Sequence, residues 1–388
     1  MRIVIAPSGF KENLDAENVA SAIAQGVLRA CPDADVIELP LADGGEGTAH
    51  TMARMTGGSV KNVRVTGPVG ERIDAGLALL GGEEPVAVVE IAMAAGLKLV
   101  PREQRDPCRT TTRGVGELIA LALDAGVSRI LVGCGDSGVN DGGAGLVRAL
   151  GGKLLDADGA EIAEGGMGLK HLDRIDLSDL DPRLQGVEIE VACNMKNLLC
   201  GENGVARIFG PQKGASPDDV EYLAAALDHY ADVIERDLGI DVRSMPGGGA
   251  SGGIGAGLHA MLGAKLSSRF DVLLPYFGLD EALAGTDLII TAEGGIDFKT
   301  ARGKIPAEIG DRARLLDIPV IALAGTIGER AEVVHEHGVS AFFSTVHAPE
   351  TLEEAMSIAE SELVQCAENV MRTVLAGIAI ADKRAAAR

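Results

Sequence analysis

Four short segments of this sequence combine glycine with carboxylate or amide side chains, and each follows an apolar run that predicts a β-strand. They are 7–12 (PSGFKE), 42–48 (ADGGEGT), 135–143 (GDSGVNDGG) and 293–297 (EGGID). Glycine lets the backbone approach a ligand closely, while carboxylates can hold Mg²⁺ or accept a proton. One such segment is usually only a turn, but four at strand ends indicate a shared site.

Cationic side chains lie close to these segments. The formal net charge is −22, so an anionic substrate must be met by a local cation or by a metal. Lysines among glycines are therefore candidates for neutralising phosphate or carboxylate, although each alone is equally consistent with a solvated surface side chain. The candidates are Lys11, Lys213 in 210–214 (GPQKG), and Lys299, Arg302 and Lys304 after Asp297.

A glycine-rich stretch at 247–257 contains the pattern G-x-G-x-x-G, but the preceding DVRSMP is not the buried strand that a dinucleotide fingerprint requires. We interpret the stretch, with Gly249 and Gly252, as a helix start whose N–H groups bind an anion. Asp271, about twenty residues on, keeps a nicotinamide-dependent oxidoreductase as the weakest alternative. No G-x-x-x-x-G-K-[ST] sequence occurs, which argues against a P-loop kinase.

Other catalytic and metal signatures are missing from the sequence. The seven histidines fit no Ser-His-Asp pattern and no H-E-x-x-H, so hydrolase chemistry is disfavoured. The six cysteines show no zinc spacing, and we expect most of them to be buried.

Strand and helix patterns alternate along the 388 residues, which predicts an α/β fold with parallel sheets. The expected strands are 2–6, 36–39, 86–91, 129–133, 287–291, 320–324 and 341–345. The length favours two domains. We expect one discontinuous Rossmann- or flavodoxin-like domain, 1–55 with 280–388, and an inserted α/β domain, 56–279.

The acidic composition, with a pI near 4.7, disfavours nucleic acid and membranes as partners. The apolar run near the amino terminus is too short for a signal peptide, and we expect no segment that spans a bilayer. The sequence therefore predicts a cytoplasmic protein, and a homodimer is compatible with it.

Several segments, and the order in which they follow one another, resemble the glycerate kinase type I family along nearly the whole chain. The resemblance implies a two-domain α/β kinase with its active site in the cleft between the domains. It also implies transfer of phosphate from Mg-ATP to D-glycerate, usually at the 2-hydroxyl. The matching segments are 3–12 (IVIAPSGFKE), 40–48 (PLADGGEGT), 110–119 (TTTRGVGELI), 140–145 (NDGGAG), 197–204 (NLLCGENG), 209–215 (FGPQKGA), 253–258 (GIGAGL) and 293–304, with EGGID and GK.

Together, the glycine segments and the resemblance give a set of predicted site residues. Asp43, Asp141, Lys11 and Asn194 are the predicted catalytic residues, and Asp43 and Glu46 the predicted metal ligands. The predicted ligands of substrate or phosphate are Lys213, Ser137, Asn140, Glu293, Asp297, Arg302, Lys304, Gly249 and Gly252.

Four positions depart from the family pattern, all of them in site segments. The family has Asp where this chain has Ser8, Asp where it has Asn194 and Arg where it has Gly295, and this chain adds a carboxylate at Asp136. The lost Arg at Gly295 and the added Asp136 make the predicted pocket less cationic, and the four departures together favour as an alternative a kinase for a different small hydroxy acid. A second alternative is a binding or regulatory protein that kept the fold and lost turnover.

Overall fold

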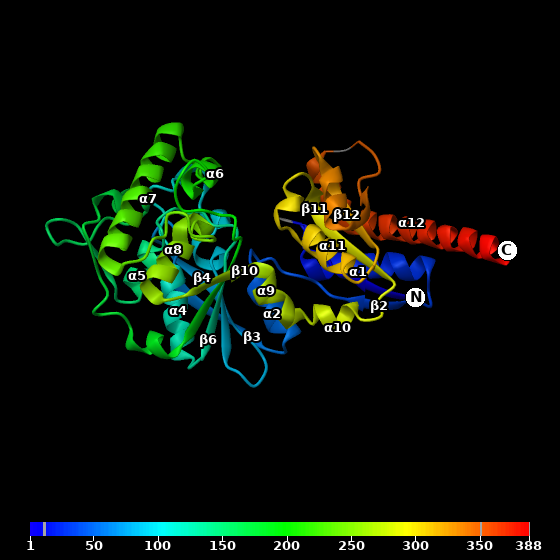
Figure 1. Cartoon of the computed structure of the whole chain (residues 1–388), viewed down its shortest axis with the longest axis horizontal. Helices are drawn as coiled ribbons and strands as arrows, with labels where there is room; N and C mark the ends of the chain where they lie inside the picture. Colours follow the sequence, from blue (N-terminus) through cyan, green and yellow to red (C-terminus); the bar gives the residue numbers. More distant parts are fainter. Residues whose placement is uncertain (11–12, 350, 388) are drawn as a thin grey trace. The chain divides into compact units, whose positions relative to one another are not determined.

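The computed structural model describes residues 1–10, 13–349 and 351–387, so Lys11 lies outside the described residues, as does the side chain of Arg302. The chain forms two compact units, Met1–Asp43 with Phe277–Arg388 and Gly44–Tyr276 (Figure 1). The first boundary falls ahead of the expected residue 55, because helix α2 (Thr48–Met55) packs on strands of the second unit.

The first unit is built on a parallel five-stranded sheet of order β13-β12-β11-β1-β2. In β1, Ile3 and Ile5 are fully buried, as expected for a central strand of a parallel sheet. The strands are β1 (Arg2–Ile5), β2 (Asp35–Glu38), β11 (Leu288–Ile296), β12 (Val320–Ile327) and β13 (Val339–Ser344).

Helices α1 (Ala16–Ala30) and α12 (Leu352–Ala386) contact each other and close one core of this unit. Asp15 caps α1 by accepting a hydrogen bond from the Asn18 amide at 2.8 Å. The other helical segments are α10 (Leu279–Leu283), η7 (Thr300–Arg302), α11 (Ile305–Arg314) and η8 (Ala331–His337).

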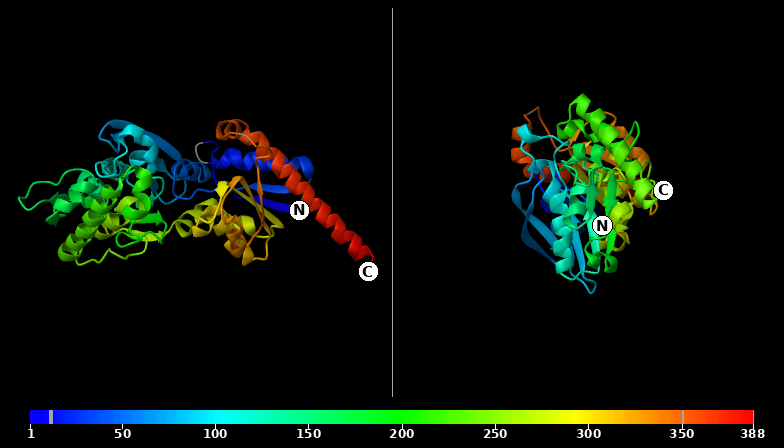
Figure 2. Two further views of the ribbon diagram at one scale, coloured as in Figure 1. Left: turned by 90° about the horizontal axis from the view of Figure 1, so that it is seen from above. Right: turned by 90° about the vertical axis from the view of Figure 1, so that its left-hand side faces the viewer.

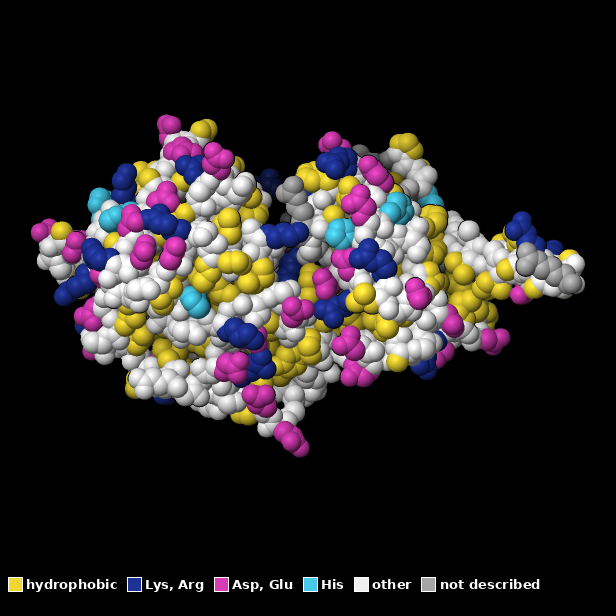
Figure 3. Space-filling model, in the orientation of Figure 1, with side chains coloured by type: hydrophobic (Ala, Val, Ile, Leu, Met, Phe, Trp, Pro, Cys, Tyr) yellow, Lys and Arg dark blue, Asp and Glu magenta, His cyan; other side chains and the backbone are white. Residues whose placement is uncertain are grey.

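Among the described residues, α12 is the one helix long and apolar enough to cross a membrane by length and composition, where the sequence analysis expected none. Its first half is a core helix, in which Leu363, Ala367 and Met371 are buried. Its C-terminal part projects beyond α1 (Figure 2) and exposes Ile378 and Ile380. On the face drawn in Figure 3, acidic and basic side chains of the molecule are interspersed.

The second unit contains a six-stranded sheet of order β10-β9-β6-β5-β4-β3. Strands β5, β6, β9 and β10 pair in parallel, whereas β3 and β4 pair antiparallel, an arrangement that the sequence analysis did not predict. The strands are β3 (Ser59–Thr66), β4 (Arg72–Leu79), β5 (Val86–Glu90), β6 (Arg129–Gly133), β9 (Glu188–Cys193) and β10 (Lys265–Ser268), with a separate pair, β7 (Lys153–Leu155) and β8 (Arg174–Asp176).

Helices α4 (Arg113–Asp124), α5 (Ala144–Ala149), α7 (Pro217–Leu238) and α8 (Ala250–Leu262) contribute many of the buried apolar residues of this unit, and strands and loops supply the rest. The two-domain α/β class predicted from the sequence is confirmed. The helical segments of the unit, besides α2, are α3 (Ala92–Ala95), η1 (Leu97–Leu99), η2 (Arg102–Gln104), α4 (Arg113–Asp124), α5 (Ala144–Ala149), η3 (Gly166–His171), η4 (Pro182–Gly186), α6 (Val205–Phe209), η5 (Pro211–Lys213), α7 (Pro217–Leu238), α8 (Ala250–Leu262), α9 (Arg269–Leu273) and η6 (Leu274–Phe277).

Candidate functional site

The carboxyl ends of β5, β6 and β9 meet at one edge of the six-stranded sheet, and the turn 44–47 lies directly on it. A Cβ atom on Gly133 would lie 2.9 Å from the carbonyl oxygen of Gly44, and one on Gly135 would lie 2.5 Å from the Cα of Gly45. Two backbone segments therefore touch where side chains would keep them apart, which explains the glycines in both motifs.

Glu90, the last residue of β5, holds this turn in place. It is fully buried, and its two carboxylate oxygens accept the amides of Gly47 and Ala49, each at 3.0 Å. Burial raises the pKa of Glu90 to about 7, against the two backbone hydrogen bonds and in the same direction as the carboxylates of Glu46 and Asp136. The first turn of α2 is thus occupied by a carboxylate of the protein itself. Sequence reasoning missed Glu90, whose signal is an acidic residue ending the apolar run VAVVE.

We expect Glu90→Gln to loosen the turn. Glutamine offers one acceptor oxygen and an NH₂ group that cannot accept, so one amide loses its partner. At pH 8, amide hydrogen exchange of residues 44–50 is expected to rise at least about tenfold, which corresponds to about 1.4 kcal/mol. Glu117→Gln is the matched control, because Glu117 accepts the amide of Thr66 at 2.8 Å in a different part of the unit. Unchanged exchange of residues 44–50 in Glu90→Gln would contradict the assignment.

Asp141, near the end of the loop 135–143, is fully buried. Its carboxylate accepts the amide and hydroxyl of Thr112 at 2.9 and 2.8 Å and the amides of Gly143 and Gly145 at 3.1 and 3.2 Å. Burial raises the pKa of Asp141, while these hydrogen bonds act in the opposite direction. With its lone pairs committed to the loop and to the 110–119 segment, Asp141 is placed to position the backbone rather than to contact a ligand.

Lys213 is buried beneath the same loop and contacts two other predicted site residues, Ser137 and Asn140. Its ammonium group lies 3.1 Å from the Ser137 hydroxyl, 2.6 Å from the Val139 carbonyl oxygen and 2.9 Å from Asn140 Oδ1. An ammonium group has three N–H donors, so these three contacts use all of them. Burial lowers the pKa of Lys213 to about 7, although the nearby Asp141 carboxylate raises it. Lys213 therefore fixes the shape of the loop, where the sequence suggested a direct contact with phosphate.

The glycine-rich stretch packs against this loop. A Cβ atom on Gly252, which has a φ of +81°, would lie 2.0 Å from the Val139 carbonyl oxygen, and one on Gly249 would lie 2.0 Å from that of Leu198. The Gly142 amide also donates to the Gly252 carbonyl at 3.0 Å. The structure thus gives a packing reason for these glycines, and the anion-binding helix start expected from the sequence stays a prediction.

In the first unit, Glu293, Asp297 and Lys304 lie together at the end of β11. Lys304 forms an ion pair of 2.5 Å with Glu293, and the carboxylate of Asp297 accepts the amide of Lys299 at 2.7 Å. The strand continues to Ile296, beyond the predicted end at 291, so that Glu293 lies within it.

Ser8 and Asp43 lie at the same edge of the first sheet. The Ser8 hydroxyl donates to the carbonyl oxygen of Ala292, next to Glu293, at 3.0 Å. Asp43 follows β2, and the nearby Leu41 amide donates to the Pro7 carbonyl oxygen at 2.9 Å. This edge therefore collects carboxylates and a hydroxyl from three neighbouring strands.

The remaining predicted residues, Glu46 and Asn194, lie in the second unit. Glu46 is exposed and pairs with Lys98 at 2.8 Å, and Asn194 Oδ1 accepts the Lys196 amide at 3.0 Å. No group of three or more His, Cys, Asp and Glu side chains is placed to hold a metal ion within the described part of the chain. A nucleotide-bound Mg²⁺ needs only one or two protein carboxylates.

Comparison with known proteins decides the family. The model of the glycerate kinase family matches residues 3–375. This chain belongs to the glycerate kinase family. It is 46% identical over 97% of its length to "Glycerate 2-kinase" of Escherichia coli K12, of which it covers 99%, and 44% identical over 96% to "Glycerate kinase" of Haemophilus influenzae, also with 99% coverage.

A crystal structure from Salmonella typhimurium LT2, provisionally named glycerate kinase 2, has the same fold as this family member. The TM-score is 0.83 at 47% identity, over 97% of this chain and 99% of that one. The resemblance stated from the sequence is thus confirmed, and the chain is a phosphotransferase of the kinase class.

Proposed function

We propose that this enzyme transfers the γ-phosphoryl group of ATP to D-glycerate and forms 2-phosphoglycerate. The main support is the 46% identity, over nearly the full length of both chains, to a relative named glycerate 2-kinase. The proposal includes a small hydroxy acid and a nucleotide as ligands, and a cytoplasmic location.

Phosphoryl transfer needs positioning and charge neutralisation more than covalent chemistry. In our proposal Lys304, paired with Glu293, meets the charge of a phosphate or a carboxylate, and Asp43 accepts the proton of the reacting hydroxyl or holds the metal. The loop 135–143 presents its outer residues, while Lys213 and Asp141 keep its backbone rigid from below.

Mg²⁺ would neutralise charge on the transferred group when it enters with the nucleotide. Asp43 and Glu46 are the carboxylates that we propose to hold it. Glu46 would exchange its exposed pairing with Lys98 for the metal, a small loss because exposed ion pairs contribute about 0–1 kcal/mol.

The positions that depart from the family pattern bear on the acceptor. The Asp136 carboxylate accepts the Glu46 amide at 3.3 Å, so it has a role in holding the turn 44–47. Gly295 faces Thr326 across β11 and β12, and a Cβ atom there would lie 2.7 Å from the Thr326 hydroxyl oxygen. The change at Asp136 therefore has a structural reason that does not require a different acceptor.

A coupled assay of ADP release with D-glycerate, L-glycerate, glycolate, lactate and tartrate tests the proposal. We expect the highest kcat/KM for D-glycerate. We also expect Mg-ATP, and not NAD, to raise the thermal midpoint, since a ligand at a hundredfold excess over its Kd stabilises the native state by about 2.7 kcal/mol. Preference for another acid would support the altered-acceptor alternative, and absence of ADP release with every acid would support a binding protein.

A further inference from the structure

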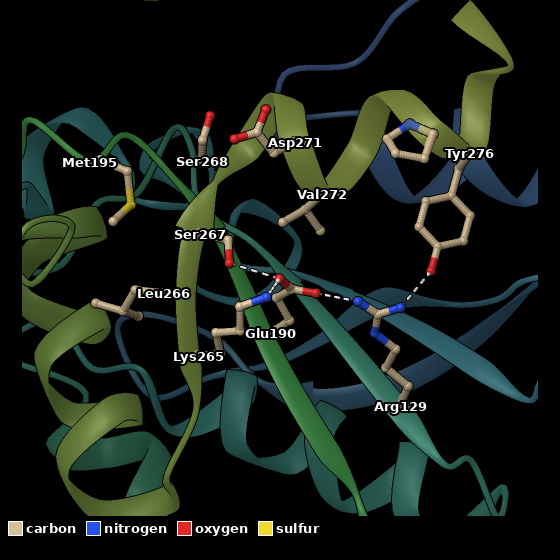
Figure 4. Close-up of a pocket in the computed structure, with 11 residues that line it drawn as sticks. Arg129, Glu190, Met195, Lys265, Leu266, Ser267, Ser268, Asp271, Val272 and Tyr276 are labelled. Atoms are coloured by element: carbon tan, nitrogen blue, oxygen red, sulfur yellow. Dashed lines mark hydrogen bonds and ion pairs between the residues drawn. The ribbon is translucent and has the colours of Figure 1, made fainter. Parts of the chain in front are cut away.

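A cavity of about 660 Å³ lies in the second unit (Figure 4), and two of its lining residues, Met195 and Leu266, pack near Gly247 of the glycine-rich stretch. It is open to solvent on one side and is lined by β10, the middle of β9, the first residue of β6, and the segment formed by α9 and η6. Of the predicted site residues that the structure describes, none lines it. Its volume is in the range of small-molecule sites, about 300–1,000 Å³.

The polar floor of the cavity is organised around Glu190. This residue is only 3% exposed, and its carboxylate accepts the Ser267 hydroxyl at 2.7 Å, the Lys265 ammonium at 3.0 Å and the Arg129 guanidinium. Burial would raise the pKa of Glu190, but these three hydrogen bonds hold it below its usual value. The floor therefore carries one carboxylate charge against two cationic charges, while Asp271 adds a second carboxylate elsewhere in the lining.

The two cations have more donors than Glu190 can use. Lys265 directs one of its three N–H groups to Glu190, and its side chain is 67% exposed. The second guanidinium nitrogen of Arg129 makes only a long contact, 3.5 Å, with the Tyr276 hydroxyl. Figure 4 shows Lys265 and Arg129 approaching Glu190 from opposite sides, with the Tyr276 hydroxyl beside Arg129. The two cations therefore flank Glu190 and keep surplus donors.

The rest of the wall is largely apolar. Met195, Leu266, Val272 and Pro275 line the cavity, and Asp271 lies beside Ser268 on the side away from Arg129 (Figure 4). The cavity thus has a cationic floor and an apolar body, an arrangement complementary to a ligand with one acidic group on a short carbon skeleton.

We propose that this cavity binds a small organic anion with one acidic group, whose acid lies against Lys265 and Arg129 and whose carbon skeleton lies along Val272 and Pro275. The proposal is independent of the phosphotransferase reaction, because binding is expected without nucleotide. In a chain of net charge −22, such a cationic recess has to overcome the repulsion of the surrounding surface. We therefore expect a dissociation constant in the millimolar range.

Methyl-¹³C-methionine NMR of the full chain tests this proposal, since Met195 lines the cavity and its resonance can be assigned with Met195→Leu. Sodium lactate, sodium pyruvate and inorganic phosphate are titrated separately without nucleotide. At least one is expected to shift the Met195 resonance saturably. Lys265→Met should raise its Kd about tenfold or more, because one charge-assisted hydrogen bond is worth about a factor of ten to a hundred.

Lys61→Met, which removes an exposed lysine of β3 outside the cavity, is the matched control and should leave the Kd unchanged. Saturation by phosphate alone would support the anion site and assign it to phosphate esters. No shift with any of the three at about 50 mM, or an equal Kd in Lys265→Met and wild type, would overturn the proposal. Neither result depends on whether the enzyme phosphorylates glycerate.

Discussion

Lys213→Met is expected to lower kcat/KM for D-glycerate at least about a thousandfold, equivalent to about 4 kcal/mol. Methionine fills similar space but donates no hydrogen bond, so Ser137, Val139 and Asn140 lose the group that holds them. Acceptors left unpaired in a buried position cost about 1–3 kcal/mol each. We therefore expect the free energy of unfolding to fall as well, by about 2–4 kcal/mol in urea titrations.

Lys153→Met is the control for this prediction. Lys153 is exposed and pairs with Asp179, so its replacement removes a lysine and an ion pair without touching the loop 135–143. Turnover and stability should both stay close to wild type. If Lys213→Met kept kcat/KM within tenfold of wild type, the loop would not depend on this ammonium group.

Asp43→Asn is expected to lower kcat at least about a hundredfold with little change in stability. Lys213→Met, by contrast, is expected to lower both activity and stability. A lost general base or metal ligand typically costs this much, and the half-buried Asp43 lies in the segment that follows β2, not in a core. Steady-state kinetics and thermal unfolding of the same preparation measure the two quantities.

Asp35→Asn provides a control in the strand that precedes Asp43. Asp35 begins β2 and pairs with Arg2 at 2.8 Å on the surface, so it should affect neither kcat nor the thermal midpoint appreciably. Near-normal kcat in a folded Asp43→Asn variant would remove Asp43 from the proposed mechanism.

The sequence predicted the α/β class and most of the strands, because short apolar runs rich in β-branched residues are typical of buried β-strands. It also identified the loop 135–143 and Lys213, since glycines beside polar residues are conspicuous. It could not show that Lys213 and Asp141 face inward. Whether a polar side chain contacts a ligand or the backbone depends on partners such as Thr112, which lie far away in the sequence.

Two further features were beyond sequence reasoning for the same reason. Glu90 ends an apolar run, and only the placement of α2 above it gives its carboxylate two amides to accept. The 247–257 stretch has the composition of a phosphate-binding turn, but close backbone packing demands glycine just as strongly, as Gly252 against Val139 illustrates. Composition alone does not separate these two uses.

The insertion of the second unit between Asp43 and Phe277 has a consequence for biosynthesis. Strand β1 pairs with β11, so that the Thr291 hydroxyl bonds to the Ala6 carbonyl oxygen across 285 residues of sequence. A nascent chain emerging from the ribosome has the whole of Gly44–Tyr276 available before the first β11 residue appears. The inserted unit can therefore fold first, while β1 still lacks its neighbour β11, and an apolar strand edge left exposed in this way is a binding site for chaperones.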